Sequence, residues 1–83
     1  MSSVRNILAD ILLGSSDQSI RFDELCRVVR ALGFDERIRG SHHIFTKENI
    51  DEIINLQPKR DLAKPYQVRQ VRQLIHKYRL ELP

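Results

Sequence analysis

Apolar side chains recur at helical spacing in two segments before residue 34. The first segment contains Val4, Ile7, Leu8, Ile11 and Leu12, and the second contains Phe22, Leu25, Cys26, Val29 and Leu32. Residues three and four apart lie on one face of a helix, so the pattern predicts helices over residues 4–13 and from Phe22 to about Leu32. Gly14 and Gly33 are expected to end them, because glycine readily adopts the left-handed conformation that follows many helices.

The pattern changes after Gly33. Residues 34–39 and 43–47 have the composition of two short strands, and the Gly-Ser pair at residues 40–41 is typical of a turn between them. A second turn is predicted at residues 47–49, where Asn49 tolerates positive φ.

Residues 50–57 fit two structures. Ile50, Ile53 and Ile54 have helical spacing, whereas the run from Ile53 to Leu56 ahead of Pro58 suits a strand. Periodicity alone leaves both open for a segment this short.

A polar loop bounded by Pro58 and Pro65 precedes a third predicted helix, over about residues 66–80. Its apolar stripe contains Val68, Val71, Ile75, Tyr78 and Leu82, and a neighbouring basic stripe contains Arg69, Arg72, His76 and Arg79. The element order becomes α-α-β-β-β-α if residues 50–57 form a strand. Strands clustered between helices predict an α+β fold, in which helices pack on one face of a small antiparallel sheet and leave the other face open.

The composition is that of one small globular domain. The chain has 83 residues, of which 41% are hydrophobic and 30% are charged, which is too apolar for a disordered tail. It contains no run of transmembrane length, and its start lacks the basic segment of a signal peptide. The single cysteine, Cys26, lies in an apolar stripe and is expected to pack in the core. One cysteine fits a reducing cytoplasm.

Positive charge is concentrated near the C-terminus. The net charge is +3, and segment 59–83 carries Lys59, Arg60, Lys64, Arg69, Arg72, Lys77 and Arg79 against Asp61 and Glu81. A basic segment of this kind points to a polyanionic partner. A solvated helix face has the same composition, so charge alone leaves both interpretations open.

The residues best suited to chemistry are Gly40, Ser41, His42 and His43. Cleavage of RNA without a metal requires a base near the 2′-hydroxyl, a proton donor for the leaving oxygen and cations for the phosphate charge. Histidine, with an ordinary pKa of ~6.5, can fill either proton-transfer role. From these residues alone, the alternative is a polar hairpin without activity.

Three basic side chains and the turn are candidates for phosphate contacts. Arg37 and Arg39 are two residues apart and share a face of the predicted strand, and Lys47 lies across the hairpin. Backbone donors at Gly40 and Ser41 can approach a phosphate closely, because glycine has no side chain.

Alternation along a strand separates the two histidines. If Phe45 points into the core, His43 shares its face and His42 points towards the open side. His42 is then the candidate proton-transfer residue, and His43 is the more structural of the two, although it stays among the candidate substrate contacts. Histidines that point apart do not share a metal, and no cysteine or close carboxylate completes a ligand set. We therefore expect no metal and, without a phosphate-binding loop or dinucleotide motif, no cofactor.

Several segments resemble the HicA mRNA interferases of bacterial toxin–antitoxin pairs. They are Phe-Asp-Glu-Leu at residues 22–25, Leu-Gly-Phe at residues 32–34 and Arg-Gly-Ser-His-His-Ile-Phe at residues 39–45. The stretches at residues 54–58 and 63–71 are similar to one subgroup of that family. The likeness covers about residues 20–82 in the order and spacing of the family.

The resemblance implies a double-stranded-RNA-binding-like α-β-β-β-α fold with a three-stranded antiparallel sheet, in which residues 53–57 form the third strand. It also implies metal-independent endoribonucleolytic cleavage of mRNA in the cytoplasm, with His42 of the Gly-Ser-His motif as the catalytic residue. A HicB-like antitoxin would cover the active face, and no membrane is involved. The alternative is a non-catalytic module of the same fold that binds RNA or protein.

The resemblance leaves residues 1–19 outside, so we expect an N-terminal helix and linker followed by a HicA-like domain over residues 20–83. This extra helix packs as an arm, forms a homodimer contact or helps to bind the partner. The chain departs from many relatives at two places. Gln57-Pro58 stands where they have a proline and a second histidine, and Pro65-Tyr66 stands where they have a glycine-threonine pair.

Overall fold

The computed structural model of the chain describes residues 3–83. Its elements are α1 (Val4–Leu13), α2 (Phe22–Ala31), β1 (Asp35–Arg39), β2 (His42–Lys47), β3 (Ile50–Leu56) and α3 (Pro65–Tyr78). The predicted order α-α-β-β-β-α is confirmed, and the ambiguous segment forms a strand. That strand begins at Ile50, three residues earlier than the resemblance implied, because the turn at Asn49 (φ 71°) returns the chain directly alongside β2.

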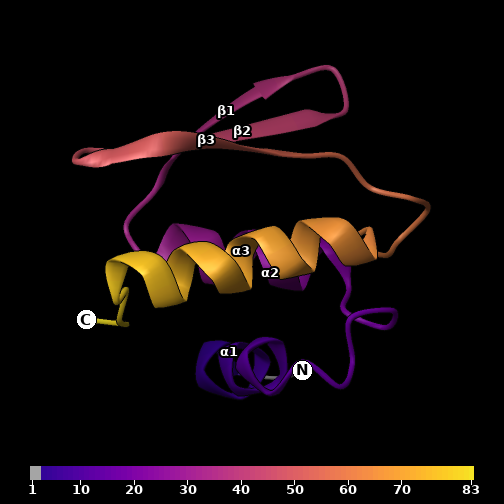
Figure 1. The fold of residues 1–83 in the computed structure, drawn as a ribbon. Coiled ribbons are helices and arrows are strands. Elements are labelled where there is room, and N and C mark those ends of the chain that lie inside the picture. Colours follow the sequence, from indigo (N-terminus) through magenta and orange to yellow (C-terminus); the bar gives the residue numbers. More distant parts are fainter. Residues whose placement is uncertain (1–2) are drawn as a thin grey trace.

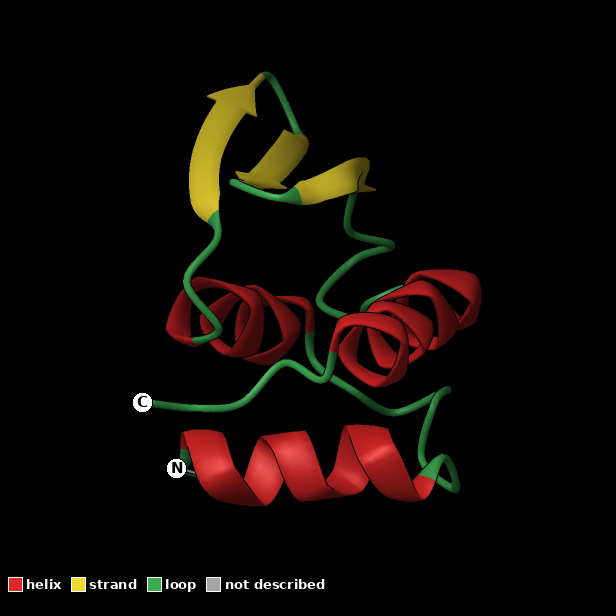
Figure 2. Cartoon of the chain, turned by 60° about the vertical axis from the view of Figure 1, so that its left-hand side comes forward, coloured by secondary structure: helices red, strands yellow, loops and turns green. Residues whose placement is uncertain are grey.

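The elements form three layers. Figure 1 shows the sheet above α2 and α3, with α1 below these two helices, and Figure 2 shows the same layers from another side. Because both inner helices lie under the sheet, its opposite face carries no element among residues 3–83. The predicted open face is confirmed.

The sheet is antiparallel with strand order β1-β2-β3. Phe45 in the central strand pairs with Glu36 of β1 and Ile54 of β3, and its side chain is fully buried. Since alternate residues share a face, this register places every second residue of the three strands towards the helices. The β1–β2 turn has Gly40 at φ 58°, a conformation that favours glycine.

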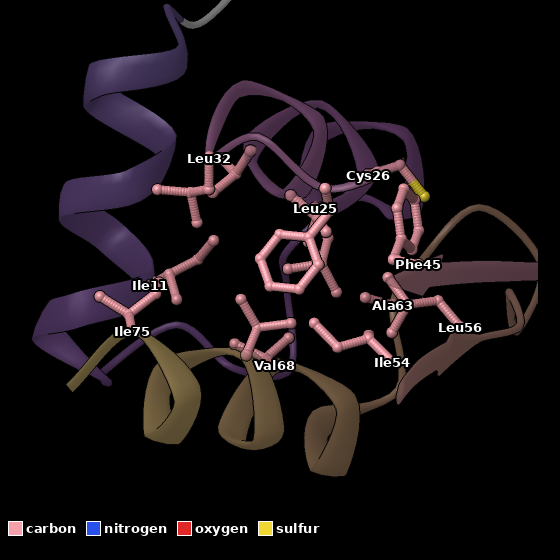
Figure 3. Packing of buried hydrophobic residues seen from close by; sticks show 14 of the residues in the cluster. Ile11, Leu25, Cys26, Leu32, Phe45, Ile54, Leu56, Ala63, Val68 and Ile75 are labelled. Carbon is pink, nitrogen blue, oxygen red and sulfur yellow. The ribbon is translucent and has the colours of Figure 1, made fainter. Parts of the chain in front are cut away.

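One hydrophobic core fills the space between the layers, and Figure 3 shows its packing. Its buried members are Ile7, Ile11, Ile20, Leu25, Cys26, Val28, Val29, Leu32, Phe34, Phe45, Ile54, Leu56, Ala63, Val68, Val71, Leu74 and Ile75. The helix stripes predicted most of them, and α1 contributes through its inner face. The predicted position of Leu12 in that stripe is wrong in part, because Leu12 is 38% exposed at the edge of the contact.

Arg72 of α3 fastens α1 and its linker to the rest of the molecule. Its guanidinium donates to the backbone oxygen of Ile11 at 3.0 Å and to both carboxylate oxygens of Asp17, at 2.9 and 3.0 Å. The hydrogen bonds between the two side chains lower the pKa of Asp17 and raise that of Arg72. One residue of the predicted basic stripe therefore has a structural role.

A second polar contact ties the sheet to α3. Glu52 of β3 accepts from the Lys77 ammonium at 2.6 Å and from the Tyr78 hydroxyl. The two donors lower the pKa of Glu52 to about 2.

No helix within residues 3–83 combines the length and the apolar surface needed to cross a membrane.

We expect Asp17→Asn to destabilise the fold by about 1 kcal/mol at neutral pH, because the amide cannot replace a charge-assisted pair that is mostly shielded from water. The pKa of Asp17 is lowered in the folded state, so the pair stabilises the protein above the unfolded pKa of ~3.9 and this contribution is lost as the pH falls through the lower folded value. Thermal unfolding should show a gap between wild type and variant that narrows below about pH 4.

Asp10→Asn, a change at an exposed aspartate of α1, is the matched control and should leave the unfolding temperature unchanged. A gap for Asp17→Asn that stays constant from neutral to acid pH would contradict the assignment.

Candidate functional site

The open face of the sheet brings His42 together with polar and basic side chains. Arg39 is the register partner of His42, and Arg37 is the partner of Ile44, two residues further along β2. Directly opposed residues on a sheet have Cβ atoms roughly 5 Å apart, so the Arg39 side chain starts beside the imidazole. His42, Arg37 and Arg39 are all exposed. The predicted grouping of these three residues matches their placement.

The His42 ring is oriented by Asn55 of β3. The imidazole Nδ1 lies 3.1 Å from the Asn55 side-chain oxygen Oδ1. A carbonyl oxygen only accepts, so the proton of this hydrogen bond belongs to Nδ1. In a neutral ring Nε2 then carries no proton and remains an acceptor that faces solvent. The arrangement prepares His42 to take up a proton at Nε2.

The turn before His42 is held by the end of β3. Gln57 donates from Nε2 to the Ser41 hydroxyl at 3.1 Å, and the Gln57 carbonyl accepts from the side chain of Gln67 at 3.1 Å. Gln67 is fully buried at the start of α3. A Cβ placed on Gly40 would meet nothing within 4 Å, so the space beside the turn is open to a ligand.

His43 lies on the opposite face of the sheet, towards the helices. Its Nδ1 is 2.7 Å from Glu36 Oε2, and its ring meets the edge of Phe22 with centroids 5.0 Å apart. Glu36 also accepts two hydrogen bonds from Arg30, and these, with the bond to His43, lower its pKa. The structure therefore does not bring His43 to the substrate side, because alternation in β2 turns it away from His42.

Three potential metal ligands meet at this inner position. Cys26, Glu36 and His43 have ligand atoms within 4.8 Å of one another, although no close cysteine or carboxylate was expected from the sequence. These groups are poorly suited to bind a metal. Both Glu36 oxygens already accept hydrogen bonds from Arg30 or contact His43, and burial raises the pKa of the Cys26 thiol to about 12, so the thiol stays protonated. We interpret the group as the polar contact between α2 and the sheet.

Lys47 does not join the other candidates. It is at the far end of β2, five residues from His42, a separation of roughly 16 Å along a strand. Its ammonium lies 2.5 Å from the position that a Cβ on Gly33 would take. The structure therefore does not bring Lys47 together with Arg37 and Arg39, and a joint contact of the three with one phosphate stays a prediction.

Sequence reasoning missed the side chains that position the candidates, namely Asn55, Gln57 and Glu36. Asn55 had a usable signal. It lies between the core residues Ile54 and Leu56, so alternation would have placed it on the open face once the segment was taken as a strand.

Comparison with protein families gave one match. The family model described as HicA toxin of bacterial toxin-antitoxin matches residues 22–76, from the start of α2 into the last turns of α3. The match includes His42, Asn55 and both arginines of the open face and leaves α1 outside. No curated protein and no solved structure gave a significant match.

The contact between His42 and Asn55 predicts a tautomer that can be measured. At about pH 8.5, where imidazoles are neutral, ¹⁵N NMR should find the His42 proton on Nδ1. Asn55→Ala removes the acceptor, so the proton should move towards Nε2. The resonances of His76 on α3 serve as an internal control and should not change. An unchanged tautomer in the variant would show that Asn55 does not orient the ring.

Proposed function

This chain belongs to the HicA toxin family, and we propose that it is a toxin-type endoribonuclease that cleaves mRNA without a metal ion. The observation that carries the proposal is the exposed imidazole of His42, oriented by Asn55 and opposed by Arg39 on the open face of the sheet. This is the combination of a proton acceptor and a cation that cleavage of a phosphodiester by its own 2′-hydroxyl requires.

In the proposed reaction, His42 Nε2 removes the proton of the 2′-hydroxyl, and the 2′-oxygen attacks the adjacent phosphorus. The bond from phosphorus to the 5′-oxygen breaks, which gives a 2′,3′-cyclic phosphate and a 5′-oxygen that takes its proton from solvent. General-base catalysis by a positioned histidine contributes roughly 10²–10⁴-fold to the rate.

Arg39 has the electrostatic role in this proposal. The phosphate gains negative charge as the 2′-oxygen attacks, and a guanidinium next to the imidazole stabilises that charge. The backbone donors of Gly40 and Ser41 adjoin His42 in the chain, at a turn with room for a ligand. Arg37, one register step away, supports binding of the neighbouring phosphate.

The proposal includes a protein partner. Toxins of such pairs are held inactive by an antitoxin, and we propose that a HicB-like antitoxin binds this chain and covers His42. The exposure of His42, Arg37 and Arg39 supports this proposal. No element among residues 3–83 covers the face on which they lie, so a partner protein can bind there. An mRNA substrate also implies that the protein acts in the cytoplasm.

His42→Ala should abolish cleavage of single-stranded RNA by the purified protein in the presence of a chelator. Binding to the same RNA should persist, because the arginines remain in place. The measurement is gel analysis of the RNA, together with an affinity determination for the variant.

His76→Ala is the control, since His76 is an exposed histidine on α3, away from the open face. Intact RNA with the wild type, accompanied by binding, would instead identify a non-catalytic RNA-binding module. Undiminished cleavage by His42→Ala would remove this residue from the mechanism.

The variants Arg39→Gln and Lys47→Gln test separately how much each of these two cations contributes to RNA binding. Each phosphate contact to single-stranded RNA adds about 0.7 to the slope of log affinity against log salt. We expect Arg39→Gln to reduce this slope by about that amount and Lys47→Gln to leave it unchanged, because Lys47 lies beside Gly33. Equal effects of the two variants would contradict the separation. The measurement is a salt titration of RNA affinity in the His42→Ala background.

A further inference from the structure

The open face contains apolar surface next to His42 that the cleavage chemistry does not use. Ile53 of β3 is 59% exposed, and Ile44 at the centre of the face is partly exposed. An isoleucine exposed on a sheet face forgoes the free energy gained by removing its apolar surface from water. Contiguous exposed apolar surface often marks a binding site.

The two isoleucines form part of a hollow of about 550 Å³. The other residues of its lining are Asp35, Glu36, Arg37, Arg39 and Thr46. We call the two isoleucines the floor of the hollow. Arg37 and Arg39 supply hydrogen-bond donors on one side of this floor, and Asp35 supplies a carboxylate at its far end. This mixture suits a flat ligand with an apolar face and polar edges.

The floor lies within one nucleotide of the candidate catalytic group. Ile44 follows His42 by two residues on the same face, a separation of roughly 7 Å along the strand. Arg37 is opposite Ile44 in β1, and Asn55 is opposite Ile44 in β3. A phosphate beside His42 and Arg39 would thus have the base of its own or the adjoining nucleotide over Ile44.

We infer that Ile44, Ile53 and Arg37 form a nucleobase site, and that the substrate is single-stranded RNA with one base laid on this floor. The π-face of the base contacts the two isoleucines, and the guanidinium of Arg37, beside this floor, binds the phosphate next to the base. This inference rests on the proposed function for its ligand class, and it adds where on the protein one base of the RNA is bound.

The surroundings favour an unpaired base over other occupants. In an A-form duplex both faces of a base are covered by its neighbours, so a paired base cannot reach a flat floor. An apolar protein side chain would fill the floor but leave the guanidiniums of Arg37 and Arg39 without anions. The phosphates on either side of a nucleobase supply those anions. Asp35 lies at the end of the hollow away from Arg39, where an N–H group at the edge of a base, such as N3–H of uracil, can donate to it.

The test compares Ile53→Ser with Ile38→Ser, both in the His42→Ala background so that the RNA stays intact. Ile38 is 57% exposed, on β1, and points to the other side of the sheet, so it matches Ile53 in residue type and exposure but lies outside the hollow. Three probes are used: a short oligouridine, an abasic oligomer of the same length and an RNA duplex. Fluorescence anisotropy gives each Kd.

Ile53→Ser should raise the Kd for oligouridine several-fold, because part of the apolar contact with the base is lost, and should leave the Kd for the abasic oligomer unchanged. Ile38→Ser should change neither value. Ile53→Ser should also leave the Kd for the duplex unchanged, because no paired base reaches the floor. The inference is overturned if oligouridine and the abasic oligomer bind equally, if oligouridine does not bind, or if both serine variants weaken binding alike.

These outcomes are separable from those of the proposed function. A wild type that leaves RNA intact, with the Ile53→Ser effect present, removes the nuclease and keeps the nucleobase site. A wild type that cleaves RNA, with no Ile53→Ser effect, keeps the nuclease and removes the site. If Ile53→Ser alters only binding of a HicB-like protein, the floor serves that partner and the inference is overturned.

Discussion

The burial of Phe45 at the centre of the sheet is the constraint on which the other features depend. Because this side chain must face the helices, alternation directs His43 inwards and His42 and Ile44 outwards. A register slip of one residue would exchange the two faces, so it would bury His42 and expose Phe45. The hydrophobic core thereby selects which of two adjacent histidines meets solvent. The polar contacts of each histidine then follow from the face on which it lies.

Two polar contacts fix the position of the sheet relative to the helices. On the inner side, Glu36 links His43 of β2 to Arg30 of α2. At the end of the sheet, the buried amide of Gln67 accepts from the backbone of Lys64 and donates to Gln57, whose own side chain holds Ser41. Burial of an amide is costly unless its donors and acceptors are satisfied, so the start of α3 is fixed to the β1–β2 turn. The candidate site thus depends on residues that touch no substrate.

Sequence patterns were sufficient to predict the features that depend on neighbouring residues alone. The helix stripes, the turns at Gly40 and Asn49 and the opposite directions of His42 and His43 all follow from period and chain stereochemistry. The segment from Ile50 remained open because its three isoleucines satisfy both periods, and only pairing with β2 decides between them. The contact of Arg72 with Asp17 joins residues far apart in sequence and had no local signal. Lys47 was grouped with Arg37 and Arg39 for its charge and its place in the hairpin, although its five-residue distance from His42 along β2 already separates it from that end of the sheet.

The single thiol of this chain is a natural reporter of motion in the fold. Cys26 is buried between α2 and the sheet, and its raised pKa leaves almost no reactive thiolate at neutral pH. An alkylating reagent can therefore modify it only when α2 separates from the strands. The modification rate measures how often that opening occurs, and it does so without a label or a substitution. Because His43 and Glu36 lie at the same contact, each opening event also breaks the contact between α2 and the strand that carries His42.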